Sequence, residues 1–145
     1  MRFDQPSLLD RIVNRAFGSL VKIGLGLSHN FLLEVRGRKT GHVYSTPVNL
    51  LEHNGKRYLV APRGHTQWVR NVIANEKATL VRGGKRENIC LQRIADEAKP
   101  ELLKTYLDRY KLTVQRYFPI PAGSPVEDFK PLVGQYPVFE LTSDP

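Results

Sequence analysis

The chain has 145 residues, one cysteine and a formal net charge of +8 at neutral pH. This length suits one domain, which can bury enough apolar surface to fold without crosslinks. The single cysteine, Cys90, excludes an internal disulfide and a cysteine-cluster metal site, and it fits a reducing intracellular compartment.

The positive charge is concentrated in the middle of the chain. Residues 36–93 carry twelve basic residues against three acidic ones, whereas residues 1–35 carry four against three and residues 94–145 carry six against eight. Such a block indicates an anionic partner: a phosphate-bearing cofactor, a nucleic acid or membrane headgroups.

The spacing of apolar residues predicts an amphipathic helix over residues 7–27. We expect residues 1–28 to form this helix and to pack on the rest of the domain; a helix that lies on a membrane surface is the alternative. Charged residues interrupt the stretch, so we expect neither a signal peptide nor a membrane span. The expected location is cytoplasmic, with peripheral contact at the inner face of the membrane if the alternative holds.

From residue 31 onward the apolar period changes to two, which predicts β-strands. We expect about six strands, at residues 31–36, 43–51, 56–61, 78–82, 85–94 and 138–141. Asn54-Gly55 is the strongest short signal for a type I′ hairpin turn, and Gly83-Gly84 predicts a further hairpin. The strands are therefore expected to run antiparallel.

Two further helices are predicted, a short one over residues 68–75 and a longer one that begins near Pro100. Five prolines between residues 117 and 137 exclude a regular helix there and suit a stiff, ordered loop. The predicted fold class is α+β, mainly β, with an antiparallel sheet curled into a small barrel over residues 29–145.

The run Gly37-Arg38-Lys39-Thr40-Gly41 places two cations between two glycines, directly after a predicted strand. Glycine permits positive φ and close backbone approach, so successive N–H groups of this turn can face one concavity while Arg38 and Lys39 supply charge. The run predicts an anion-binding turn with both basic side chains exposed. A solvated basic hairpin turn is the alternative.

Five short motifs follow one another in order over residues 30–94. They are the basic turn, then Ser45-Thr46-Pro47-Val48, then Tyr58-Leu59-Val60-Ala61, then Arg63-Gly64, then Trp68-Val69-Arg70-Asn71 with Ala74-Asn75. In this order and spacing they resemble the deazaflavin-dependent nitroreductase and quinone reductase family, whose members use coenzyme F420. The resemblance implies a split β-barrel of the flavin-reductase type.

The resemblance also implies roles for individual residues. The phosphate and polyglutamate tail of the cofactor would be held by the basic turn, at Arg38, Lys39, Thr40 and Gly41. The deazaflavin ring would lie against the next strand and the loops near it, at Ser45, Thr46, Pro47, Val48, Ala61, Pro62, Arg63, Gly64, Trp68, Arg70 and Asn71. Flavin mononucleotide is the alternative cofactor. Residues 64–67 lead straight to Trp68, which is a shorter loop than the family pattern.

Three residues are candidates for contact with a hydride acceptor. Tyr117 and Phe118 stand where the proline-rich segment begins, and a flat acceptor could stack on them; packing is the alternative. His65 lies in the short loop and could donate a proton, although a surface histidine is favoured. The histidines are scattered without partners at metal-ligand spacing, so we predict no metal site.

The preferred hypothesis is an enzyme that passes hydride from reduced F420 to a small-molecule acceptor, namely a quinone, a nitro compound or an activated alkene. The first alternative is a divergent split-barrel protein that binds a fatty acid or another amphiphile, with weak or no F420 turnover. A nucleic-acid binder is the weakest alternative, because few aromatic residues interleave with the basic segment.

Overall fold

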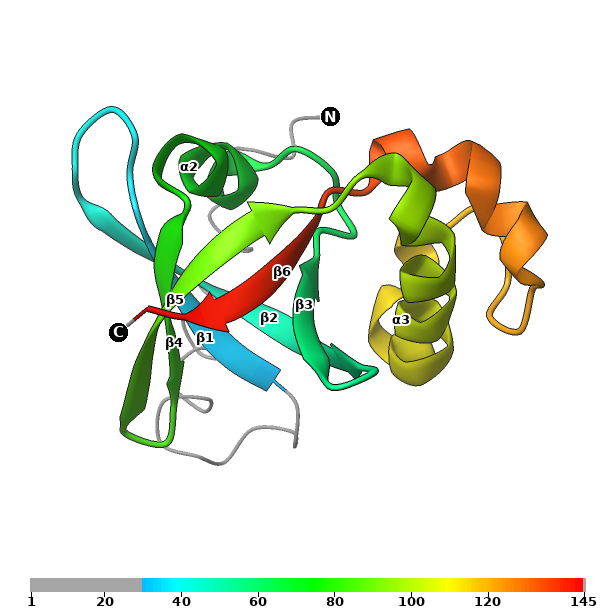
Figure 1. Cartoon of the computed structure of the whole chain (residues 1–145), viewed down its shortest axis with the longest axis horizontal. Helices are drawn as coiled ribbons and strands as arrows, with labels where there is room; N and C mark the ends of the chain where they lie inside the picture. The colour runs from blue at the N-terminus through cyan, green and yellow to red at the C-terminus, as the bar shows by residue number, and fades with distance from the viewer. Residues whose placement is uncertain (1–29, 145) are drawn as a thin grey trace.

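The computed structural model describes residues 30–144, which contain a closed antiparallel barrel of six strands (Figure 1). Around the barrel the strands follow the order β1-β2-β3-β6-β5-β4. Their bounds are β1 Asn30–Arg36, β2 Val43–His53, β3 Lys56–Val60, β4 Lys77–Arg82, β5 Lys85–Arg93 and β6 Val138–Ser143. The predicted antiparallel barrel is confirmed.

Helices stand on two sides of this barrel: α2 Gln67–Asn75 lies beside the β1–β2 hairpin, and α3 Lys99–Val114 lies beside β3 (Figure 1). Both helices confirm the predicted spans. Among residues 30–144, no helix is long and apolar enough to cross a membrane. The predicted helix over residues 7–27, and with it the division at residue 28, lies outside the described residues.

The β2–β3 turn has the backbone that its sequence predicts. Asn54 has φ 52° and Gly55 has φ 77°, the two positive values that a type I′ turn requires. His53 and Lys56 pair directly across the turn. Local sequence alone therefore accounts for this hairpin and its register.

β2 divides its pairing between two neighbours. Its residues 43–49 pair with β1, and its residues 50–53 pair with β3. On the β3 side, residues 43–49 thus have no strand partner among residues 30–144. This half of β2 is the part that contains Ser45, Thr46, Pro47 and Val48.

Side chains that alternate along the strands form two apolar clusters. Leu33, Leu59, Ile89 and Phe139 fill the barrel interior, and Val69 and Val72 of α2 close one side of it. The opposite faces of β2 and β3 contribute Leu51 and Tyr58 to a second cluster outside the barrel, beneath α3 and the C-terminal segment. Residues 58–60 of β3 and residues 50–51 of β2 are therefore covered on both faces, whereas residues 43–45 of β2 are exposed.

The proline-rich segment differs from the prediction of a loop. It contains short 3₁₀ helices, η2 Gln115–Tyr117 and η3 Val126–Gln135, with Pro131 inside η3. Phe129 of η3 is fully buried against α3. Proline has no backbone N–H to donate, which breaks the hydrogen-bond pattern of an α-helix. Short 3₁₀ turns, whose hydrogen bonds are fewer and less regular, tolerate this missing donor.

One charged group ties three strands together. The carboxylate of Glu87 on β5 accepts two hydrogen bonds from Arg57 on β3, at 2.7 and 2.9 Å, and one from the Ser143 hydroxyl on β6, at 2.6 Å. These bonds stabilise the ionised form and lower the pKa of Glu87 to about 2.

Candidate functional site

The basic turn between β1 and β2 is closed by its own backbone. The Gly37 N–H donates to the His42 carbonyl at 2.6 Å, and the Gly41 N–H donates to the Gly37 carbonyl at 3.0 Å. Gly41 has φ 79°, which favours glycine at that position. The His42 N–H donates to the Thr40 hydroxyl at 3.2 Å. The prediction that successive N–H groups face one concavity is therefore wrong for these donors, because the turn itself uses them.

Gly37 is needed for a different reason. A Cβ atom at this position would lie 2.7 Å from Cε2 of Tyr44, which is closer than carbon atoms approach. The Tyr44 ring therefore lies directly against the backbone of the turn, while about half of its surface remains exposed (52%). Glycine allows this close contact between turn and strand.

Arg38 does not extend freely into solvent. Its guanidinium donates to Gln67 Oε1 at 2.8 Å and to Asn71 Oδ1 at 2.9 Å, and its backbone N–H donates to the same Asn71 oxygen at 3.0 Å. Asn71 is buried in α2, with 4% of its surface exposed. The expectation that the Arg38 side chain is exposed needs correction: Arg38 is partly buried and joins the turn to α2.

A second amide of α2 strengthens this junction. Asn75 donates from Nδ2 to the carbonyl of Arg36 at 2.8 Å, and the Arg36 guanidinium in turn donates to the Gly41 carbonyl, also at 2.8 Å. One face of α2 therefore holds the end of β1 and the start of the turn. Lys39, next to Arg38, is exposed and makes no ion pair or hydrogen bond with any of the described residues.

The chain between β3 and α2 forms a compact loop. The Ala61 N–H donates to the Pro137 carbonyl at 2.9 Å, and the Gly64 N–H donates to the Ala61 carbonyl at 3.1 Å. Gly64 has φ 81°. The loop delivers Thr66 to the N-cap position of α2, yet its side chain makes no capping bond. Among the described residues, Thr66 Oγ1 is the one buried side-chain polar atom without a hydrogen-bond partner.

Trp68 and the middle of β2 both pack on the interior of the barrel. The Trp68 ring lies 6.0 Å from that of Phe139, and both Trp68 and Val48 pack on the interior cluster. Thr46, Pro47 and Val48 are partly exposed and Ser45 is exposed, with β1 on one side of them. Together with the basic turn, these residues and α2 form one continuous region of the fold.

The candidates for acceptor contact do not join this region as a group. Phe118 is buried in the second cluster and stacks on Tyr136 at 4.5 Å, which is the packing alternative. Tyr117 belongs to the same cluster, and its hydroxyl accepts a hydrogen bond from Arg116 at 2.6 Å. His65 is exposed in the loop before α2. Acceptor contact by Tyr117 or His65 stays a prediction.

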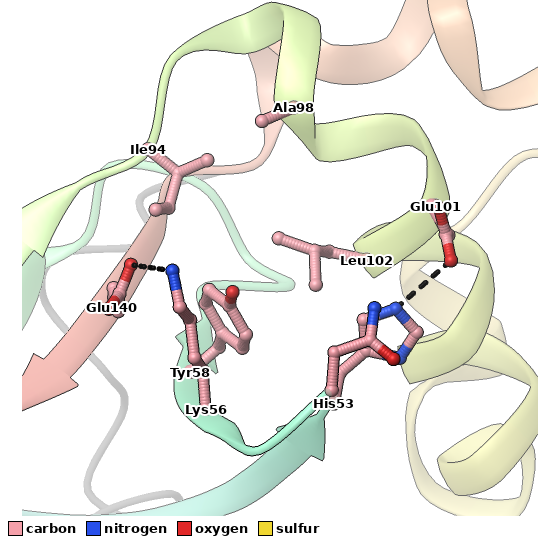
Figure 2. A pocket seen from close by; sticks show the side chains of 9 residues that line it. His53, Lys56, Tyr58, Ile94, Ala98, Glu101, Leu102 and Glu140 are labelled. Carbon is pink, nitrogen blue, oxygen red and sulfur yellow. Dashed lines mark hydrogen bonds and ion pairs between the residues drawn. The ribbon is translucent and has the colours of Figure 1, made fainter.

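A separate pocket of about 260 Å³ lies between the β2–β3 hairpin and the start of α3 (Figure 2). His53, Tyr58, Glu101 and Glu140 are among its lining residues. None of the residues predicted to bind the cofactor lines it. Sequence reasoning missed this pocket, because no motif marks the residues that converge there.

Comparison with protein families assigns the chain. The model of the F420H(2)-dependent quinone reductase family matches residues 10–118, which is most of the chain. The chain belongs to this family. It is therefore an F420-dependent reductase, and its cofactor is coenzyme F420. Among proteins with curated functions, none matches the chain significantly.

Solved structures share the barrel of this F420-dependent reductase. An F420-H2 dependent reductase, FDR-A, has 22% identity and a TM-score of 0.54, over 79% of this chain and 94% of its own. A structure described as a domain-swapped dimer has 19% identity and a TM-score of 0.55, over 92% and 93%. A 5-nitroimidazole antibiotic resistance protein from Bacteroides thetaiotaomicron has 14% identity and a TM-score of 0.52, over 94% and 81%. At these identities the likeness establishes the fold.

The residues around the turn of this reductase fit a phosphate-bearing cofactor. Lys39 offers an exposed cation beside the junction with α2, and it has no partner among residues 30–144. Thr66 offers a buried hydroxyl that no described residue satisfies, and such a group is costly unless a ligand or water pairs with it. Phosphate oxygens and ribityl hydroxyls are hydrogen-bonding partners of the kind that these two groups lack.

Proposed function

We propose that the chain binds F420 over the basic turn, residues 45–48 of β2, the loop at residues 61–64 and the first turn of α2. The observation that carries this proposal is the set of hydrogen bonds from Arg38 to Gln67 and Asn71, at 2.8 to 3.0 Å. They hold the turn and α2 against each other. Residues that are far apart in the sequence thereby form one surface.

The two cations of the turn take different roles in this proposal. Lys39 binds the phosphate or the anionic tail, because it is exposed and has no partner among residues 30–144. Arg38 is a positioning residue: it fixes the turn through α2 and contributes positive charge nearby. The Thr66 hydroxyl donates a hydrogen bond to a polar group of the cofactor.

Reduced F420 supplies the hydride when it is bound. The chain has to bind and orient it, exclude water and leave one side open to the acceptor. Arg63, Trp68 and Arg70 contribute to the ring side of the proposed surface, where positive charge stabilises the negative charge that develops on the acceptor. No acid–base pair is needed among these residues.

We propose a quinone as the preferred acceptor, with nitro compounds and activated alkenes as weaker ones. The family description names a quinone, and Val43 and Tyr44 present apolar surface (55% and 52% exposed) on the same half of β2 as the proposed ring site. A flat, apolar acceptor fits such a surface better than a charged one.

Oxidation of reduced F420 by a soluble naphthoquinone, by a nitroaromatic compound and by an activated alkene tests this proposal. We expect the highest kcat/KM with the quinone. Lys39→Ala should raise the KM for reduced F420 roughly ten- to a hundredfold and leave kcat nearly unchanged, because the phosphate lies away from the reacting carbon. Lys85→Ala, which removes an exposed lysine beside another glycine turn, is the matched control. Equal KM values in the two variants would contradict the assignment of Lys39.

A further inference from the structure

Tyr58 lies at the base of the pocket beneath the β2–β3 hairpin, and its hydroxyl oxygen, unlike Thr66 Oγ1, is not a buried atom. Tyr58 is buried, with 8% of its surface exposed, and it lines the pocket. Its hydroxyl makes no hydrogen bond among the described residues, and Figure 2 shows it directed into the pocket. A phenol in this position is ready to bond a ligand.

One histidine–carboxylate hydrogen bond and one ion pair flank this phenol on opposite sides of the pocket (Figure 2). His53 Nε2 lies 3.0 Å from Glu101 Oε1. On the other side, Lys56 Nζ lies 3.9 Å from Glu140 Oε1, which is beyond hydrogen-bond length. Lys56 and Glu140 therefore attract each other without sharing a hydrogen bond, and each keeps bonding capacity for a third group.

The charges and the size of the pocket restrict its ligand. A simple anion would face two carboxylates, Glu101 and Glu140, and a simple cation would face Lys56. A molecule with an ammonium and a carboxylate on the same carbon matches the Lys56–Glu140 pair at once. Ile94 and Leu102 offer an apolar wall for a short alkyl group. The volume of about 260 Å³ lies below the range of drug-sized sites, which suits so small a ligand.

We propose that this pocket binds a small zwitterion with an apolar body, that is, a free α-amino acid. Its carboxylate lies on Lys56, its ammonium on Glu140 and its side chain against Leu102, while the Tyr58 hydroxyl bonds the carboxylate. The site is separate from the surface assigned to F420, since the two share no residue. The inference therefore does not depend on where the cofactor binds.

Calorimetric titration of the full chain with L-leucine tests the proposal. We expect saturable binding, at least tenfold tighter than that of 4-methylpentanoate or 3-methylbutylamine, which lack the ammonium and the carboxylate respectively. Lys56→Met and Glu140→Gln should each weaken leucine binding roughly ten- to a hundredfold, the loss of one charge-assisted hydrogen bond. Tyr58→Phe keeps the buried ring and should weaken binding severalfold by removing one neutral hydrogen bond.

Lys77→Met is the matched control, because Lys77 is similarly exposed (66% against 59% for Lys56) and its Nζ lies 3.4 Å from Asp144 Oδ2, and neither residue lines the pocket. It should bind leucine as the unchanged chain does, and thermal melts confirm that every variant is folded. Absence of leucine binding overturns the proposal. The proposal is also overturned if Lys56→Met, Glu140→Gln and Tyr58→Phe all bind leucine as tightly as the unchanged chain. It is overturned as well if 3-methylbutylamine or 4-methylpentanoate binds as tightly as leucine.

Discussion

The turns at the two ends of β2 are both hairpin turns rich in glycine, but they are held by different interactions. The β2–β3 turn rests on two residues with positive φ, and a Cβ atom at Gly55 would meet nothing within 4 Å. The β1–β2 turn rests on contacts with distant residues: Arg38 bonds Gln67 and Asn71 on α2. The first turn is specified locally and the second by tertiary structure.

This difference has a functional meaning. The locally specified turn needs no help from the rest of the chain. The basic turn is fixed against α2, so an exposed cation on it, Lys39, is held in a defined place. A binding group that is positioned in advance loses less entropy when the ligand arrives.

Asn71→Ala should have the largest effect on this contrast. It removes the oxygen that accepts two hydrogen bonds from Arg38, so the Arg38 backbone N–H loses its partner and the guanidinium keeps only its bond to Gln67. We expect the free energy of unfolding to fall by about 2 to 3 kcal/mol in urea denaturation. Asn75→Ala, which removes an exposed amide of the same helix, should cost about 1 kcal/mol or less. If both variants lose the same free energy of unfolding, the buried hydrogen bonds of Asn71 stabilise the chain no more than the exposed one of Asn75.

Arg38→Ala should come next. It removes the two guanidinium bonds but keeps the backbone bond to Asn71, so we expect a loss of about 1 to 2 kcal/mol in the free energy of unfolding. Lys39→Ala, one residue along, should change it by about 0.5 kcal/mol at most, as is usual for exposed side chains. If Arg38→Ala and Lys39→Ala have the same free energy of unfolding, the guanidinium hydrogen bonds contribute nothing to stability and the turn is only a solvated hairpin turn.

Gly55→Ala tests the locally specified turn. A side chain at φ 77° is strained even where space is open, so we expect a loss of about 1 kcal/mol. Gly134→Ala is the matched control, because that site is equally open and its φ is not positive. Thermal or urea unfolding of both variants should separate them. If Gly55→Ala has the same free energy of unfolding as the unchanged chain, the turn does not require a positive φ at this position.

A contribution of similar size comes from the long-range ion pair of the β2–β3 hairpin, between Arg57 and Glu87. The pKa of Glu87 is lowered from 4.5 to about 2 in the folded chain, so its stabilisation is complete above pH 4.5 and is lost as the pH falls toward 2. Because its side chain is 38% exposed, we discount the full shift for solvent screening and expect about 1 kcal/mol. Glu87→Gln should remove this part of the pH dependence of unfolding. If the free energy of unfolding of Glu87→Gln depends on pH between 2 and 4.5 as that of the unchanged chain does, the contribution assigned to Glu87 is contradicted.

The sequence predicted the elements that depend on local patterns. Alternating apolar residues revealed the strands, and the pair Asn54-Gly55 revealed its turn. It could not predict that Arg38 bonds α2, because the partners Gln67 and Asn71 lie about thirty residues away and their amides carry no pattern that pairs them. The motif order found the family, but the contacts within the site arise only when the hairpin and α2 come together.

The C-terminal segment shows the same limit. Proline content correctly argued against an α-helix, yet it could not reveal that η3 buries Phe129 and that Tyr136 stacks on Phe118. The lining of the pocket beneath the β2–β3 hairpin was equally hidden from sequence reasoning. Its residues come from the β2–β3 hairpin, the segment between β5 and α3, β6 and α3, and only the closed barrel and the docked helix bring them together.

The salt dependence of F420 binding tests most directly whether the basic turn holds the anionic part of the cofactor. Oxidised F420 is titrated into the unchanged chain and into Lys39→Ala at low and at physiological ionic strength. We predict that affinity falls as salt rises, and that Lys39→Ala binds more weakly and responds less to salt, since one exposed cation is gone. Salt-insensitive binding, or the same affinity and salt response in both proteins, would contradict the account.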